Sequence, residues 1–143
     1  MVRDSPSQYS SHSASLFVRK YKFFKIGTFY YSNGNAERRI EEGIFISERL
    51  PLIYAMVLKE EIMYIGETIQ GYRRPLKYHT NEDMPYVRNG ILNLVSMGHE
   101  VNVFARTREL EIEFEGLVLN LRVSLEAALI KKYTPSWNKK VER

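Results

Sequence analysis

Two short apolar segments separated by three polar residues constrain the fold of this sequence more than any other feature. The first runs from Leu52 to Leu58 and the second from Ile62 to Gly66, with the polar residues 59–61 between them. Apolar runs of this length, broken by a polar turn, are typical of two neighbouring antiparallel strands. The sequence therefore predicts a β-hairpin over residues 52–66.

The length of the hairpin loop decides whether two tyrosines share one face of the sheet. A two-residue loop would place Tyr54 and Tyr64 on opposite faces, because side chains alternate along a strand. An odd loop centred on Glu60 pairs position 58 with 62, 56 with 64 and 54 with 66. The tyrosines then become diagonal neighbours, about 7–8 Å apart at Cα. We expect the odd loop, although it lacks the glycine usual in three-residue hairpins.

Weaker patterns predict the remaining elements. Strands are expected over 17–26, 28–31, 101–105, 110–114 and 117–123, and helices over 36–42, from Pro75, and over 87–97 with Gly98 as C-cap. A last helix is expected to start at Ser124 as N-cap and to run to Tyr133, burying a stripe of four residues: Leu125, Ala128, Leu129 and Tyr133. The predicted fold class is α+β, a small mixed sheet with a central antiparallel hairpin flanked by helices.

Composition excludes several classes of protein. The chain has no cysteine, which excludes disulfides and thiolate zinc sites. Its three histidines are too few and too scattered for a histidine-rich metal site. No segment approaches the roughly 20 apolar residues that span a bilayer, and the serine-rich N-terminus lacks the apolar region of a secretory signal. We therefore expect a cytoplasmic protein without membrane contact. The net charge of +4 favours a polyanionic partner but does not identify one.

A set of polar residues offers the parts that phosphodiester hydrolysis needs. Glu126 is an acid in the predicted first turn of an otherwise apolar helix, Arg74 precedes a helix start, and tyrosines lie on the hairpin. Such a reaction needs a carboxylate to hold a divalent cation, a cation to neutralise phosphorane charge, and a group to manage the proton of the attacking water. Oxygen ligands and phosphate point to Mg²⁺ or Mn²⁺.

These residues carry a resemblance to a known family. Ile53-Tyr54, Tyr64-Ile65-Gly66 and Arg74 follow the order Tyr-x₉-Tyr-Ile-Gly-x₇-Arg, and residues 125–138 contain Leu-Glu-Ala followed by Pro135 and Trp137-Asn138. This pattern resembles the GIY-YIG endonuclease superfamily, in particular its phage endonuclease II type and its small type II restriction enzymes. The strand over 101–106, Val-x-x-Phe-Ala-Arg, agrees with them. The resemblance covers about 60% of the chain, from Leu52 to Asn138.

The resemblance implies a role for each matching residue. Tyr54 would sit near the attacking water, as a proton relay or as its phenolate, and Tyr64 would orient the phosphate. Gly66 would let the backbone approach closely, and Arg74 would stabilise the scissile phosphate with its planar guanidinium. Glu126 would be the single protein ligand of the metal. Asn138 would be a structural or phosphate-positioning residue.

The sequence departs from the family pattern at two places. Leu52 replaces the glycine of the first motif. Where many relatives carry a histidine four residues after the arginine, this chain has Tyr78, with His79 one place further, so either could take that role. Pro75 also restricts the backbone of Arg74 and leaves the helix start open. Lys77 and Arg88 are further candidates for a phosphate-binding cation.

Each of these residues also has an ordinary structural interpretation. Tyrosines are favoured in strands, isolated arginines lie at the surface, and a first-turn glutamate complements the helix dipole. A cluster of four cations on the first predicted strand is either a phosphate track or a solvated strand edge: Arg19, Lys20, Lys22 and Lys25. The order of all five motif elements together favours the catalytic interpretation.

The sequence thus predicts a nuclease core over 51–143, preceded by residues 1–50 as an N-terminal arm with basic, aromatic strands that grip DNA or form oligomer contacts. The expected function is metal-dependent, site-specific cleavage of double-stranded DNA. A DNA-binding module of the same fold without catalysis is the alternative. One active site cuts one strand at a time, so a homodimer or homotetramer is expected.

Overall fold

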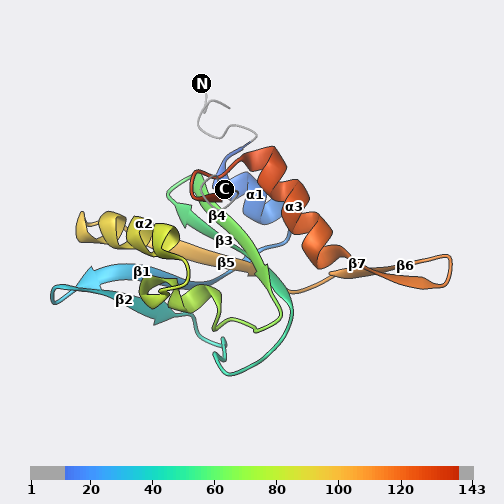
Figure 1. Cartoon of the computed structure of the whole chain (residues 1–143), viewed down its shortest axis with the longest axis horizontal. Coiled ribbons are helices and arrows are strands. Elements are labelled where there is room, and N and C mark those ends of the chain that lie inside the picture. The colour runs from blue at the N-terminus through green and yellow to red at the C-terminus, as the bar shows by residue number, and fades with distance from the viewer. Residues whose placement is uncertain (1–11, 139–143) are drawn as a thin grey trace, which may run out of the picture.

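A computed structural model describes residues 12–138, in which one five-stranded sheet carries helices on both faces (Figure 1). The chain runs through α1 (Ala14–Lys20), β1 (Phe24–Ser32), β2 (Asn35–Ile40), β3 (Leu52–Leu58), β4 (Glu61–Thr68), the 3₁₀ helix η2 (Pro75–Thr80), α2 (Pro85–Ser96), β5 (Val101–Arg106), β6 (Glu111–Phe114), β7 (Leu117–Asn120) and α3 (Leu121–Tyr133).

The five-stranded sheet has the strand order β2-β1-β5-β3-β4. The predicted α+β class and the β3–β4 hairpin are confirmed. The sheet differs from the expected mixed sheet, because each pairing between its described strands is antiparallel. The hairpin also lies at one side of the sheet, with β4 as an edge strand. Strands β1 and β2, from the N-terminal 50 residues, belong to this same sheet.

Strand β3 is buried from Leu52 to Val57 because the sheet is covered on both faces. Its even positions, such as Tyr54 and Met56, belong to a core beneath η2 and α2. Its odd positions, such as Ile53 and Ala55, belong to a second core beneath α1 and α3. The sequence of β3 is therefore a continuous apolar run, because its alternate side chains enter the two different cores.

A β-bulge sets which residues of the hairpin face each other. Tyr54 pairs with Gly66 and Met56 with Tyr64, as predicted, but Leu58 pairs with Glu61 across a two-residue turn. The register shifts after Met56, so that Met63 and Tyr64 both face the η2 and α2 side. The expected odd loop is therefore wrong. The extra residue of the bulge restores the parity that brings the two tyrosines to one face.

The N-terminal elements differ from the sequence prediction. The start of the expected strand over 17–26 is helix α1, capped by the Ser13 hydroxyl, which accepts a hydrogen bond from the Leu16 amide. Burial of Phe17 against the sheet stabilises this helix in spite of its aromatic and β-branched content. The expected helix over 36–42 is strand β2, which pairs with β1 through a turn at Asn33-Gly34.

The C-terminal elements agree with the prediction except at the start of α3. The helix is capped by Asn120, whose side chain accepts a hydrogen bond from the Arg122 amide, and not by Ser124. Glu126 therefore lies in the second turn, beyond the reach of first-turn dipole stabilisation. Leu129 and Tyr133 are buried, but Ala128, expected in the buried stripe, is exposed.

Strands β6 and β7 form a separate ribbon that projects from the body of the molecule (Figure 1). Cross-strand pairs place Ile112 beside Leu119 and Phe114 beside Leu117, and these four side chains are exposed. No helix of the described residues is long and apolar enough to cross a membrane.

Candidate active site

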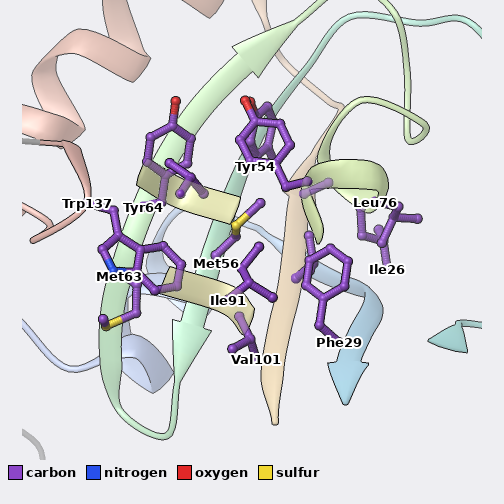
Figure 2. Close-up of a cluster of buried hydrophobic side chains, with 14 of the residues drawn as sticks. Ile26, Phe29, Tyr54, Met56, Met63, Tyr64, Leu76, Ile91, Val101 and Trp137 are labelled. Carbon is purple, nitrogen blue, oxygen red and sulfur yellow. The ribbon is translucent and has the colours of Figure 1, made fainter. Parts of the chain in front are cut away.

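Three buried tyrosines form the centre of the candidate site. Tyr54 and Tyr64 come from the β3–β4 hairpin, and Tyr78 comes from η2, which packs on the same face of the sheet. Their ring centroids lie 5.8–6.2 Å apart in each pair. The hydroxyls of Tyr54 and Tyr78 are hydrogen bonded at 2.5 Å. Figure 2 shows the hydroxyls of Tyr54 and Tyr64 pointing to the same side of the core.

Gly66 makes room for the ring of Tyr54. A Cβ atom at Gly66 would lie 2.5 Å from Cζ and 2.5 Å from the hydroxyl oxygen of Tyr54, its cross-strand partner. Tyr54 is only 2% exposed, so its ring has no free space into which to move. The glycine of the Tyr-Ile-Gly motif is therefore needed for side-chain packing on the opposite strand.

The environment of Tyr54 and Tyr64 keeps their hydroxyls protonated. Burial raises the pKa of Tyr54 well above its usual value, the neighbouring Tyr78 and Tyr64 raise it further, and Arg74 opposes them. Burial also raises the pKa of Tyr64, with contributions from Tyr78 and from the carboxylate of Glu126. In the free protein these groups therefore act as neutral hydrogen-bond donors and acceptors near neutral pH.

Arg74 places its guanidinium against the tyrosine cluster. Its Cζ atom lies 5.2 Å from the ring centroid of Tyr78. Burial lowers the pKa of Arg74, but Tyr78 and Tyr54 outweigh that effect and leave the pKa raised, so the group stays cationic. Although Arg74 precedes Pro75, its backbone is helical, with φ −61° and ψ −56°. The preference of residues before proline for extended backbone is overridden here.

Glu126 lies close to this cluster from the neighbouring helix α3. Its negative charge adds to the increase in the pKa of Tyr64, after the larger effects of burial and Tyr78. Burial raises the pKa of Glu126 itself, and the negative charge of Glu67 adds to the increase. Glu67 is paired with Arg122, whose Nε donates to a carboxylate oxygen at 2.7 Å. The sequence prediction missed this pair, although Glu67 directly follows the Tyr-Ile-Gly motif.

The carboxylate of Glu126 fits a divalent cation. Among residues 12–138 no hydrogen bond or ion pair engages it. It borders a cavity of about 530 Å³ between α3 and the C-terminal segment, and neither Arg74 nor any of the three tyrosines lines this cavity. The described residues contain no cluster of three acids or histidines. Mg²⁺ is commonly held by one or two carboxylates together with substrate phosphate and water, so a single glutamate is sufficient.

Asn138 holds the edge strand that carries Tyr64. Its Oδ1 accepts a hydrogen bond from the Ile65 amide, and its Nδ2 donates to the Ile65 carbonyl, both at 2.9 Å. Trp137 adds a backbone hydrogen bond to Met63 at 2.9 Å. The C-terminal segment therefore supplies hydrogen-bond partners to backbone groups of Met63 and Ile65 on the open edge of β4. Of the two interpretations of Asn138, this geometry supports the structural one.

The structure separates the remaining candidates from the tyrosine cluster. His79 packs its ring on Phe29 with centroids 4.9 Å apart, so Tyr78 and not His79 joins the site. Within the described part of the chain, no hydrogen bond, ion pair or ring contact joins Lys77 or Arg88 to the tyrosines.

The four N-terminal cations do not lie on one strand. Arg19 and Lys20 end α1, while Lys22 and Lys25 pair with Glu109 and Glu41, at 2.8 and 3.9 Å. The expected placement of these four cations on one strand is therefore wrong, because Arg19 and Lys20 belong to α1 and only Lys25 lies in β1. Residues 1–11 of the expected arm lie outside the described residues.

Comparison with solved structures confirms the predicted fold. Bacteriophage T4 EndoII, solved as a glutamate-to-alanine mutant, superposes with a TM-score of 0.63 at 22% identity, covering 89% of this chain and 99% of that chain. Restriction endonuclease HPY188I in complex with product DNA gives a TM-score of 0.46 at 16% identity, covering 82% of this chain and 79% of that chain. No family model and no curated protein sequence matches the chain. The chain thus has the fold of EndoII.

Proposed function

We propose that this protein is a metal-dependent DNA endonuclease that hydrolyses one phosphodiester bond at the site formed by Tyr54, Tyr64, Tyr78, Arg74 and Glu126. The observation that carries the proposal is the Arg74 guanidinium packed against three buried tyrosines, two of them joined by a hydroxyl hydrogen bond, with the carboxylate of Glu126 on the neighbouring helix α3. A structural core would gain little from three buried hydroxyls beside two charged groups. The fold shared with EndoII supports the proposal.

The side chains divide the work as follows. Arg74 binds the scissile phosphate and stabilises the negative charge that develops on it. Tyr54 takes the proton of the attacking water as it donates its own hydroxyl proton to an oxygen of the scissile phosphate, and its hydrogen bond to Tyr78 orients the hydroxyl for this transfer. Because its pKa is raised, Tyr54 acts as a relay and does not start as a phenolate. Tyr64 donates to a phosphate oxygen, and Glu126 holds Mg²⁺ or Mn²⁺.

When bound, the cation supplies Lewis-acid stabilisation of the phosphate and an activated water. The protein prepares for this cation in two ways. Glu126 lies where burial and the neighbouring Glu67 disfavour its charge, so a bound cation relieves an unfavourable interaction. Arg122 pairs with Glu67 and so leaves Glu126 as the available ligand.

Cleavage of supercoiled plasmid DNA tests the proposal. We expect nicked or linear products with Mg²⁺ or Mn²⁺ and no products after chelation. The panel should include several unmodified DNAs and DNAs with phage-type base modifications, because the sequence preference is not fixed by these residues. Cleavage that continues unchanged in a chelator would exclude the metal. DNA binding without cleavage under all conditions would instead leave a non-catalytic binding module.

Cleavage of both strands requires a second active site, so we propose a homodimer or homotetramer. The β6–β7 ribbon is the surface that we assign to the contact between copies. Its apolar face is exposed at Phe114 (55%) and Leu117 (61%). Its three glutamates, Glu111, Glu113 and Glu115, would be repelled by DNA but are complementary to a second copy of this basic chain. Light scattering should show an oligomer, and Phe114→Ser with Leu117→Ser should shift it toward the monomer.

A further inference from the structure

A basic pocket lies on the side of η2 away from the tyrosine cluster. Its volume is about 610 Å³, and it is lined by residues of β2, η2 and the segments beside them, among them Arg38, Arg73, Lys77 and His79. None of the three tyrosines lines it. It is therefore separate from the candidate active site, although one short helix contributes to both.

Neighbouring residues of η2 and of the segment just before it serve the two sites alternately. Arg74 and Tyr78 belong to the tyrosine cluster, with the guanidinium over the ring. Arg73 and Lys77, each one residue earlier, line the basic pocket. Consecutive residues, Arg73 and Arg74, therefore contribute to different sites, so one short segment of chain carries both the pocket and the tyrosine cluster.

The pocket carries excess positive charge. Arg38, Arg73 and Lys77 outnumber the one lining carboxylate, Glu37, and none of the three cations forms an ion pair within residues 12–138. Arg38 is fixed by donating from Nη1 to the Leu76 carbonyl at 2.9 Å, so its charge is held in place without being neutralised.

His79 adds a second sign of an anion site. Its Nδ1 atom is buried and has no hydrogen-bond partner among the described residues. Burial and the charge of Arg38 lower the pKa of His79, whereas Glu37 acts in the opposite direction. A bound anion would compensate the surrounding positive charge that now disfavours the imidazolium.

We infer that this pocket binds a DNA backbone phosphate close to the one that is cut. The inference rests on the proposed function, because it assumes that the tyrosine cluster holds the scissile phosphate. A duplex carries one phosphate charge per about 1.7 Å of its axis, so DNA held at the tyrosine cluster presents further phosphates to a cationic pocket on the same short segment of chain. Phosphate contacts of this kind fix register without reading sequence.

Single alanine variants test the pocket through the salt dependence of DNA binding. Arg73→Ala and Lys77→Ala should each reduce the slope of log K against log salt by about 1, since each removes one phosphate contact. The cleavage rate at saturating DNA should change less than twofold. The matched control is Arg39→Ala, which removes a cation that pairs with Glu100 and lies outside the pocket. Its slope should equal that of the wild type.

Neutral methylphosphonate placed at one position at a time identifies the phosphate. One position beside the cut should weaken binding by the wild type and should not weaken binding by Arg73→Ala further. Equal slopes for Arg73→Ala, Lys77→Ala and Arg39→Ala would overturn the inference while DNA cleavage by the wild type stands. If the wild type neither binds nor cuts DNA, the proposed function fails together with it.

Inorganic phosphate separates a DNA site from a small-anion site. The imidazole signals of His79 in NMR spectra report on the pocket, with His99, outside it, as an internal reference. We expect a short duplex to shift His79 at micromolar concentration and inorganic phosphate to do so only at far higher concentration. Equal affinity for the two would contradict the assignment to DNA.

Discussion

Replacement of Gly66 by alanine is expected to disable the site through Tyr54. The added Cβ would lie 2.5 Å from two atoms of the Tyr54 side chain, and that ring is buried and hydrogen bonded to Tyr78. Overpacking of this kind costs about 1–3 kcal/mol, and loss of the hydroxyl pair adds about 0.5–1.5 kcal/mol. Alanine also restricts the unfolded chain more than glycine does, and the resulting stabilisation of about 0.4–1 kcal/mol offsets only part of these losses. We expect a net loss of about 1–3 kcal/mol.

The displacement of the Tyr54 ring should affect the cleavage rate more than it affects the free energy of unfolding. A shift of about 1 Å in a positioned group can lower the rate about 100-fold. The assays are urea unfolding and single-turnover plasmid cleavage. DNA binding should change little, because Arg74 and the basic pocket are untouched.

A double-mutant cycle with Tyr54→Leu isolates the cause. The shorter leucine has no atoms at the positions of the ring hydroxyl and Cζ, so Gly66→Ala should cost little in that background. If Gly66→Ala destabilises the leucine variant as much as the wild type, the clash with the ring is not the reason and the packing argument is wrong.

Three further predictions concern the surroundings of the site. Tyr78→Phe leaves the buried Tyr54 hydroxyl without its partner, so urea unfolding should show a loss of about 1–3 kcal/mol and cleavage should slow; unchanged values for both would contradict the relay. Asn138→Ala removes both side-chain hydrogen bonds to Ile65, so the Ile65 amide should exchange with solvent faster than other β4 amides. Unchanged protection of this amide would refute the role of Asn138 in holding β4. Burial and Glu67 raise the pKa of Glu126, which must lose its proton to bind a cation. Activity should therefore fall as the pH drops through that raised pKa, and Glu67→Gln should move the acid limb to lower pH; a limb that stays in place or moves up would exclude the interaction.

The sequence allowed prediction of the hairpin and of the chemical types in the site because local patterns specify both. The apolar run of β3 and the order of Tyr54, Tyr64 and Arg74 needed no knowledge of distant contacts. The prediction that the two tyrosines share one face of the sheet was correct, but the odd hairpin loop from which it was derived was wrong. The β-bulge that produces it depends on how β4 packs, which alternation alone does not show.

The errors concern segments whose structure is decided by tertiary contacts. Residues 17–20 have strand-like composition but form α1, because Phe17 packs between the sheet and Tyr133. Residues 36–40 are charged and helix-like but pair with β1. The choice between Tyr78 and His79 likewise needed the orientation of η2, which directs Tyr78 toward Tyr54 and His79 toward Phe29.

Glu126→Ala, assayed for binding and cleavage on one labelled duplex with Mg²⁺, tests the central claim most directly. We predict that cleavage is lost while the duplex is bound as tightly as by the wild type, or more tightly, because a negative charge near the phosphate is gone. Cleavage at the wild-type rate, or binding and cleavage lost together in a folded variant, would contradict the assignment of Glu126 as the metal ligand.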